Sequence, residues 1–136
     1  MEIAYQIENH PSAAEFIECL IESTLGERRP VTDFERIKKM IDNANLIITA
    51  RADGQLVGIA RSVTDFSYCT YLSDLAVRKN FQRRGIGREL IRRTKLAGGK
   101  AKLILLSAPA AIDYYPKIGM KKHDHCFILN DVRELI

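Results

Sequence analysis

The chain has 136 residues, a formal net charge of +4 and a hydrophobic fraction of 46%. This length suits a single domain, residues 1–136, that can bury a core of its own. The chain lacks both an apolar run of the ~20 residues that cross a bilayer and a secretory leader at Met1-Glu2-Ile3-Ala4-Tyr5, so we expect a cytoplasmic protein with no membrane partner.

The first elements are a strand and a helix. Residues 2–7 suit a strand. Ser12 and Glu15 then form a capping-box pair at the start of a helix whose apolar residues recur at helical spacing. Gly26 is expected to end this helix, because glycine readily adopts the left-handed conformation found after helix ends.

A second helix and three strands are predicted next. Thr32 and Glu35 indicate a second capping box. Residues 46–63 suit a hairpin around the turn Ala52-Asp53-Gly54-Gln55, because Asp-Gly is a strong hairpin-turn signal. Residues 68–78 suit a third strand of this run.

The second half predicts alternating helices and strands. Residues 86–97 suit a helix and residues 103–106 a buried central strand, since they are continuously apolar. Pro109 suits the first turn of a short helix that ends before Gly119, and residues 123–129 suit a last strand. The order of elements predicts an α/β fold with a mixed sheet and helices on its faces.

The most informative segment is Gln82-Arg83-Arg84-Gly85-Ile86-Gly87, between a predicted strand and a predicted helix. A glycine turn at a helix N-terminus presents unpaired N–H groups and partial positive charge, which suit phosphate oxygens. The G-x-G-x-x-G fingerprint fails at Leu90, and no Gly-Lys-Ser/Thr follows. The alternative is an ordinary tight connection with solvated arginines.

A second motif makes the pattern specific. Three segments follow one another along the chain: Leu75-Ala76-Val77, the glycine turn, and Ala111-x-x-Tyr114-Tyr115-x-x-x-Gly119-Met120. Together they resemble the GCN5-related N-acetyltransferases (GNAT), whose pattern is L-x-V, then Q/R-x-x-G-x-G/A, then A-x-x-F/Y-Y-x-x-x-G-F. The likeness runs from about Asn45 to Met120. It implies the GNAT acyl-CoA N-acyltransferase fold, with a largely antiparallel twisted sheet and helices on both faces.

The resemblance also implies a cofactor and the residues that bind it. Acetyl-CoA is the donor and CoA the product. Backbone groups of the L-x-V strand take the pantetheine arm, those of the glycine turn take the pyrophosphate, and Ser107 is the nearest polar substitute for an asparagine of many members. The cofactor-binding positions implied in this way are Leu75, Ala76, Val77, Gln82, Arg83, Arg84, Gly85, Ile86, Gly87, Arg88, Ser107 and Tyr115.

Three positions carry the implied catalytic roles. Tyr115 matches the tyrosine that protonates the leaving thiolate, although Pro116 directly follows it and disfavours helical geometry there. The Val77 N–H is the candidate oxyanion donor. Asp74 is a base or, equally, a structural partner, because its side chain should point away from the face of Leu75, whereas Ser73 should share that face and could hold a water. Ser107 could instead cap the following helix.

The function implied is acetyl transfer from acetyl-CoA to a primary amine of a small molecule. A protein lysine or N-terminal amine acceptor, and an acyl-CoA sensor without turnover, stay open. So does a basic nucleic-acid module on the face of Arg84, Arg88 and Arg92, although no aromatic residues interleave with these arginines and we expect no nucleic-acid partner. A homodimer is common in the family, but no signal in the sequence sets it.

Metal and disulfide chemistry are not expected. Cys19, Cys69 and Cys126 are odd in number and widely spaced, which argues against a disulfide framework. His123 and His125 share one strand face, but a zinc site needs three or four ligands and no CxxC or HExxH motif supplies them.

Overall fold

The structure is a computed structural model that describes residues 2–136; Met1 lies outside the described residues. By its internal contacts the chain forms two compact units, one that ends at Leu106 and one that runs from Ser107 to Ile136. Each is described by itself. No helix within residues 2–136 is both long and apolar enough to cross a membrane.

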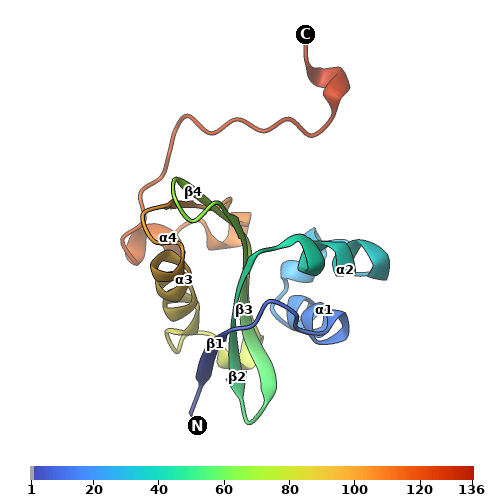
Figure 1. Ribbon diagram of the computed structural model, residues 1–136, viewed down its shortest axis with the longest axis vertical. Helices are drawn as coiled ribbons and strands as arrows, with labels where there is room; N and C mark the ends of the chain where they lie inside the picture. The colour runs from blue at the N-terminus through green and yellow to red at the C-terminus, as the bar shows by residue number, and fades with distance from the viewer. Residues whose placement is uncertain (1) are drawn as a thin grey trace. The chain divides into compact units, whose positions relative to one another are not determined.

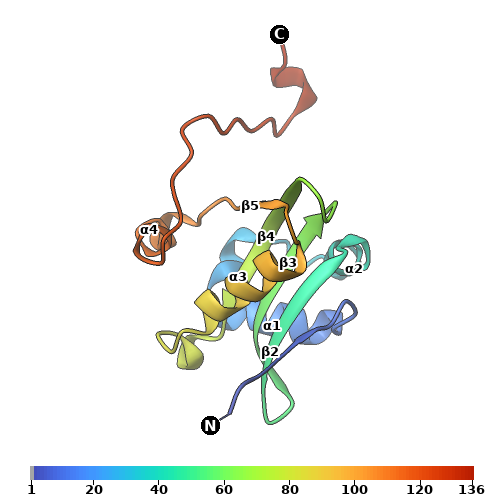
Figure 2. The same ribbon diagram turned by 60° about the vertical axis from the view of Figure 1, so that its left-hand side comes forward.

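The first unit is built on one five-stranded sheet with the strands side by side in chain order (Figures 1 and 2). Neighbouring strands are antiparallel except the last pair, which is parallel. The strands are β1 (Ala4–Ile7), β2 (Leu46–Ala52), β3 (Gln55–Thr64), β4 (Cys69–Val77) and β5 (Lys102–Ile104). The sheet is therefore mixed and mostly antiparallel, as predicted.

Helices cover both faces of this sheet. The helices α1 (Ala13–Glu22) and α2 (Phe34–Asn43) lie on one face and α3 (Ile86–Ala97) on the other, as Figures 1 and 2 show. Two apolar clusters result, one around Phe16 and Ile37 and one around Ile86 and Leu90. Each fully buried side chain of this kind stabilises the fold by about 2 kcal/mol.

Local signals set several boundaries as predicted. The Ser12 hydroxyl accepts a hydrogen bond from the Glu15 N–H at 3.1 Å, and the Glu15 carboxylate accepts one from the Ser12 N–H at 3.3 Å. In the hairpin between β2 and β3, Asp53 and Gly54 both have positive φ, 50° and 83°. Such a turn matches the right-handed twist of the two strands.

Two predicted helix boundaries are wrong. α1 ends at Glu22, and Gly26 lies in a following 3₁₀ turn, where an added Cβ would meet the Ile21 backbone at 3.1 Å. Gly26 thus allows a close backbone approach rather than a helix cap. α2 begins one residue later than the predicted box, because Asp33 is its N-cap and accepts from the Arg36 N–H at 3.1 Å.

The run 103–106 was predicted to be a buried central strand, and this is wrong. β5 ends at Ile104, pairs with β4 alone and forms the edge of the sheet, with the Ile104 side chain 51% exposed. Apolar composition alone does not distinguish the middle of a sheet from an edge, because that depends on how many neighbours a strand finds.

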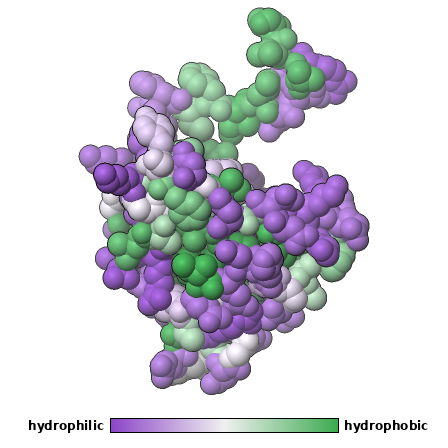
Figure 3. All heavy atoms as spheres, viewed as in Figure 1, coloured by the Kyte–Doolittle hydropathy of each residue, from purple (hydrophilic) through white to green (hydrophobic). Residues whose placement is uncertain are grey.

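The second unit holds little regular structure. A 3₁₀ turn, Pro109–Ala111, stands where a helix was predicted; α4 (Tyr114–Lys117) and a 3₁₀ turn, Val132–Glu134, follow. The predicted strand at 123–129 is wrong: residues 107–136 contain no strand, since strand geometry is stabilised only by pairing. Figure 3 shows apolar side chains gathered along this C-terminal segment, where Phe127 is 92% exposed.

A network around Arg51 joins β1, β2 and α1. Its guanidinium binds Glu8 and Glu15, each at 2.7 Å. Hydrogen bonds from Arg51 are the main reason that the pKa of Glu8 is lowered from 4.5 to about 2. Because the pKa is lower in the folded state, the ionised form of Glu8 stabilises the fold at neutral pH.

The contribution of Glu8 to stability is present above about pH 4.5 and is lost as the pH falls toward 2. We therefore expect the free energy of unfolding of Glu8→Gln to fall less between pH 6 and pH 3 than that of the wild type. Urea denaturation at several pH values measures this. Glu2→Gln removes an exposed carboxylate as the control; equal slopes for all three proteins would contradict the prediction.

Candidate active site

The strand β4 has one paired edge and one partly open edge. β5 pairs only with Cys69–Tyr71, so the C-terminal part of β4 has β3 as its single neighbour within residues 2–136. The Arg78 N–H donates to the Val57 carbonyl of β3 at 2.8 Å. Because N–H directions alternate along a strand, the N–H groups of Leu75 and Val77 point to the open edge.

The carbonyl of Val77 also points away from β3 and accepts a hydrogen bond from Gln82. The Gln82 side-chain amide donates to this oxygen at 2.9 Å. Gln82 thereby holds the start of the glycine turn against the end of β4. The predicted roles of Gln82 and Val77 thus fall on residues that the structure brings together.

A β-bulge at Ser73 decides which side chains face which side. Arg61 of β3 pairs with Asp74, but the next residue, Ser62, pairs with Leu72, so Ser73 is an extra residue. Beyond it, Leu75 and Val77 pack on the α3 side, whereas Ala76 packs on the side of α1 and α2.

The prediction that Ser73 shares the face of Leu75 is wrong. The Ser73 hydroxyl accepts a hydrogen bond from Arg61 Nη2 at 3.1 Å. Arg61 also donates to the Met40 carbonyl of α2, so it lies on the side of α1 and α2. The bulge breaks the simple alternation on which the prediction depended.

Asp74 is fully buried and held by two arginines. Its Oδ1 pairs with Arg29 Nε at 2.5 Å and its Oδ2 with Arg61 Nε. Both carboxylate oxygens are therefore occupied by guanidinium groups. Of the two roles expected for Asp74, this arrangement favours that of structural partner.

The glycine turn has the open backbone that the sequence predicts. Arg83 and Gly85 have left-handed φ angles of 64° and 81°, and Gly85 is the N-cap residue of α3. The first intrahelical hydrogen bond runs from the Glu89 N–H to the Gly85 carbonyl at 3.0 Å. Across the described chain, the N–H groups of residues 83–88 find no acceptor. Free N–H groups at a helix N-terminus are the kind of donor set that proteins use to bind anions, and the helix dipole adds positive charge there.

The arginines around the turn are not one uniform cationic face. Glu89 accepts from Arg92 at 3.0 Å and from Arg93 at 2.6 Å. Arg84 lies over the Phe81 ring, 5.2 Å from its centroid. Exposed positive charge therefore concentrates at the turn itself, on Arg83, Arg84 and Arg88.

Sequence reasoning missed Arg78, which anchors the end of β4. Arg78 is 4% exposed, and its Nε donates to the Leu56 carbonyl at 2.5 Å. Its Nη1 pairs with Glu18 at 3.0 Å and with Glu22. The i, i+4 spacing of these two glutamates on α1 is visible in the sequence, but their partner lies on another element.

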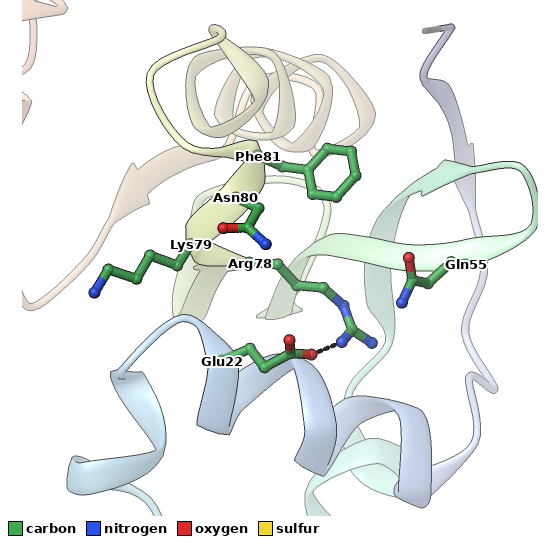
Figure 4. A pocket seen from close by; sticks show the side chains of 6 residues that line it. All are labelled: Glu22, Gln55, Arg78, Lys79, Asn80 and Phe81. Carbon is green, nitrogen blue, oxygen red and sulfur yellow. Dashed lines mark ion pairs between the residues drawn. The ribbon is translucent and has the colours of Figure 1, made fainter.

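A cavity of about 310 Å³ opens beside Arg78 (Figure 4). The Arg78–Glu22 ion pair lies at its edge, between α1 and the segment that leads into the glycine turn. Its lining residues are Glu22, Gln55, Arg78, Lys79, Asn80 and Phe81.

The second unit carries the two remaining predicted residues. Tyr115 is half-buried on α4, with its ring edge-on to Tyr114 at 5.3 Å. Pro116 occupies the first turn of α4, where a missing N–H is tolerated. Burial is the main cause that raises the pKa of Tyr115. The phenol is therefore protonated at neutral pH and able to donate.

Ser107 does not cap a helix. Its hydroxyl donates to the Ala108 carbonyl at 2.7 Å, and the N-cap position of the following 3₁₀ turn is Ala108. The expectation that Ser107 is an N-cap is therefore wrong. Its expected contact with the cofactor stays a prediction.

The family model for the acetyltransferase (GNAT) domain matches residues 22–134, which is most of the chain. The chain belongs to the GNAT acetyltransferase family. The glycine turn and the open edge of β4 both lie within the matched residues. No curated protein sequence matches the chain.

Solved structures share the GNAT fold at low identity. A candidate acetyltransferase from Deinococcus radiodurans R1 is 24% identical, with a TM-score of 0.73 over 94% of this chain and 88% of that one. A GNAT-family acetyltransferase from Streptococcus pneumoniae TIGR4 is 17% identical, with a TM-score of 0.76 over 96% and 100%. The aminoglycoside N-acetyltransferase AAC(6')-Iy, solved with CoA, is 14% identical, with a TM-score of 0.73 over 96% and 95%.

His123 and His125 are neighbours in the second unit. The rings of His123 and His125 meet edge-on at 5.3 Å. In residues 2–136 there is no group of three His, Cys, Asp or Glu side chains placed to hold a metal ion.

Gly58 of β3 sets how closely α3 approaches the sheet. An added Cβ would lie 3.1 Å from Ile86 Cγ2 and 3.2 Å from Leu90 Cδ1. Ile86 is the first residue of α3, so this contact also fixes the height of the glycine turn above the sheet. A larger residue here has to push the start of α3 outward.

We expect Gly58→Val to lower the free energy of unfolding by about 1–3 kcal/mol, because overpacking strains a filled core. Urea denaturation measures this. Gly58→Ala is the graded comparison: it adds only the Cβ, which meets Ile86 Cγ2 at 3.1 Å, so it should destabilise the fold less than Gly58→Val. A Gly58→Val protein as stable as the wild type would contradict the close-packing argument.

Proposed function

We propose that this GNAT domain, residues 1–136, is an N-acetyltransferase that moves the acetyl group of acetyl-CoA to a primary amine of a small molecule. The reaction is direct attack in a ternary complex, with CoA as the product. The observation that carries the proposal is the row of unpaired backbone N–H groups: Leu75 and Val77 on the open edge of β4, then residues 83–88 in the turn. An extended chain that ends in a diphosphate matches such a row.

The reaction needs few protein groups. The neutral amine nitrogen attacks the thioester carbon, a C–N bond forms, the C–S bond breaks, and the thiolate leaves. The nitrogen, which becomes positively charged on attack, loses one proton to water, and water returns a proton to Tyr115 after the acid step. The Val77 N–H is the proposed donor to the oxyanion that develops on the carbonyl oxygen. Tyr115 is the proposed acid that gives its proton to the thiolate, since its raised pKa keeps it protonated.

Small-molecule amines are the favoured acceptors because of what two structural neighbours act on. Two neighbours of similar fold are aminoglycoside acetyltransferases, AAC(6')-Iy and a soil metagenomic enzyme solved with sisomicin; the second is 20% identical, with a TM-score of 0.68 over 95% of this chain and 97% of that one. The segment between α1 and α2 holds Glu27, Arg28 and Arg29, and these mixed charges imply neither an acidic nor a basic pocket.

The first test is calorimetric titration with acetyl-CoA, CoA and dephospho-CoA. We expect the wild type to bind acetyl-CoA and Gly85→Asp to bind it at least about tenfold more weakly, because a carboxylate would then repel the pyrophosphate from the glycine turn. Gly54→Asp is the matched control: Gly54 has φ 83° against 81° for Gly85, and an added Cβ has open space at both. A wild type that does not bind acetyl-CoA would refute the proposed function.

The second test separates catalysis from binding. We expect Tyr115→Phe to lower the rate of thiol release with an accepted amine by about 100-fold, the typical effect of losing a general acid. Acetyl-CoA affinity should stay unchanged. Tyr114→Phe, which alters the adjacent tyrosine, is the control. Full activity in Tyr115→Phe would show that another group or water protonates the thiolate.

A further inference from the structure

The bulge in β4 is held by its own set of hydrogen bonds. Arg29 Nη2 donates to the Ser73 carbonyl at 2.8 Å, and Arg61 Nη2 donates to the Ser73 hydroxyl at 3.1 Å. The Nε atoms of the same two arginines bind the two oxygens of Asp74. Each guanidinium therefore spans Asp74 and the extra residue of the bulge.

The remaining donors of the two arginines are also engaged. Arg29 Nη1 donates to the Arg28 carbonyl at 2.9 Å, and Arg61 Nη1 donates to the Met40 carbonyl at 3.1 Å. The side chains of Asp74 and Arg61 are 0% and 9% exposed, and that of Arg29 is 21% exposed. In such a dry site, charge-assisted hydrogen bonds are strong and their geometry is fixed.

The bulge decides where the backbone donors of β4 point. With Ser73 as an extra residue, the N–H groups of Leu75 and Val77 face the open edge. If β4 lost the bulge and slipped by one residue, the same groups would turn toward β3, because N–H direction alternates at every residue. The function proposed above needs them at the open edge.

We propose that Asp74, Arg29 and Arg61 are positioning residues that clamp the bulge at Ser73 and thereby aim the Leu75 and Val77 N–H groups at the acyl donor. The inference rests on the proposed acetyl transfer. It gives Asp74 a role other than that of a base: both its oxygens are bound by guanidinium groups, and its side chain lies on the face of α1 and α2.

The clamp also joins two parts of the first unit. Arg29 lies in the segment between α1 and α2, whereas Asp74 lies on β4, the strand whose open edge is proposed to bind the donor. One residue of the loop thus reaches across 45 positions in sequence to the bulge.

The experiment compares Arg29→Lys with Arg51→Lys. Lysine keeps the charge but lacks the planar fork that lets Arg29 bind Asp74 through Nε and the Ser73 carbonyl through Nη2. Arg51 is a matched control, because it too is a largely buried arginine that binds two carboxylates, on β2, away from β4. Ser73→Ala is a milder variant, which removes only the hydrogen bond from Arg61 to the hydroxyl.

Two quantities are measured for each variant: acetyl-CoA affinity by calorimetry, and the backbone amide resonances of Leu75 and Val77 in the free protein. We expect Arg29→Lys to bind acetyl-CoA about tenfold more weakly, as for the loss of one buried hydrogen bond to a charged group. Its Leu75 and Val77 resonances should shift. Ser73→Ala should show a smaller change in the same direction, and Arg51→Lys should match the wild type in both.

Wild-type resonances and affinity in Arg29→Lys and Ser73→Ala would overturn the clamp. Equal changes in Arg51→Lys would also overturn it, since they would reflect general loss of stability. A wild type that does not bind acetyl-CoA refutes the proposed function instead, and the amide resonances of the free protein then still decide whether the clamp exists.

Discussion

The site depends on one strand that is paired along one edge and left open along part of the other. Unpaired backbone N–H groups are normally satisfied within a fold, and an open strand edge invites another chain. Here β5 stops pairing after three residues of β4, so Leu75 and Val77 keep their donors available. The glycine turn continues the same row of donors into the first turn of α3. Every proposed contact with the acyl donor in the first unit follows from this arrangement.

An open strand keeps its geometry only if its other contacts hold it. The N–H of Ala76 points to β3, and its side chain packs beneath α1 and α2. On the same face, Asp74 and Arg78 lie on either side of it, each held by oppositely charged side chains from other elements. Two buried charge clusters thus flank the stretch with the free donors. Such clusters add little net stability, but they penalise alternative registers strongly.

Helices, caps and turns were often predicted correctly, because the interactions that form them join residues only a few positions apart in the sequence. The helix 86–97, the Ser12–Glu15 capping box and the Asp53-Gly54 turn all appear as the sequence indicated. The predictions of strands and of side-chain faces that were wrong are those that needed neighbours. The run 103–106 became an edge strand, and 123–129 formed no strand, because pairing is decided by what lies alongside. Ser73 lies on the opposite face from the one predicted, because it is the extra residue of a bulge, and a bulge depends on the register between two strands.

The sequence by itself determined the family, the glycine turn and the candidate roles of Val77 and Tyr115, because short motifs carry the backbone conformations and side chains that this chemistry uses. Only the tertiary structure decided that Asp74 binds Arg29 and Arg61 and that Arg78 binds Glu18 and Glu22, over separations of 13 to 60 residues. A charged residue in a sequence has many partners of opposite sign. Which one it meets is fixed when the sheet brings distant segments together and excludes water from between them.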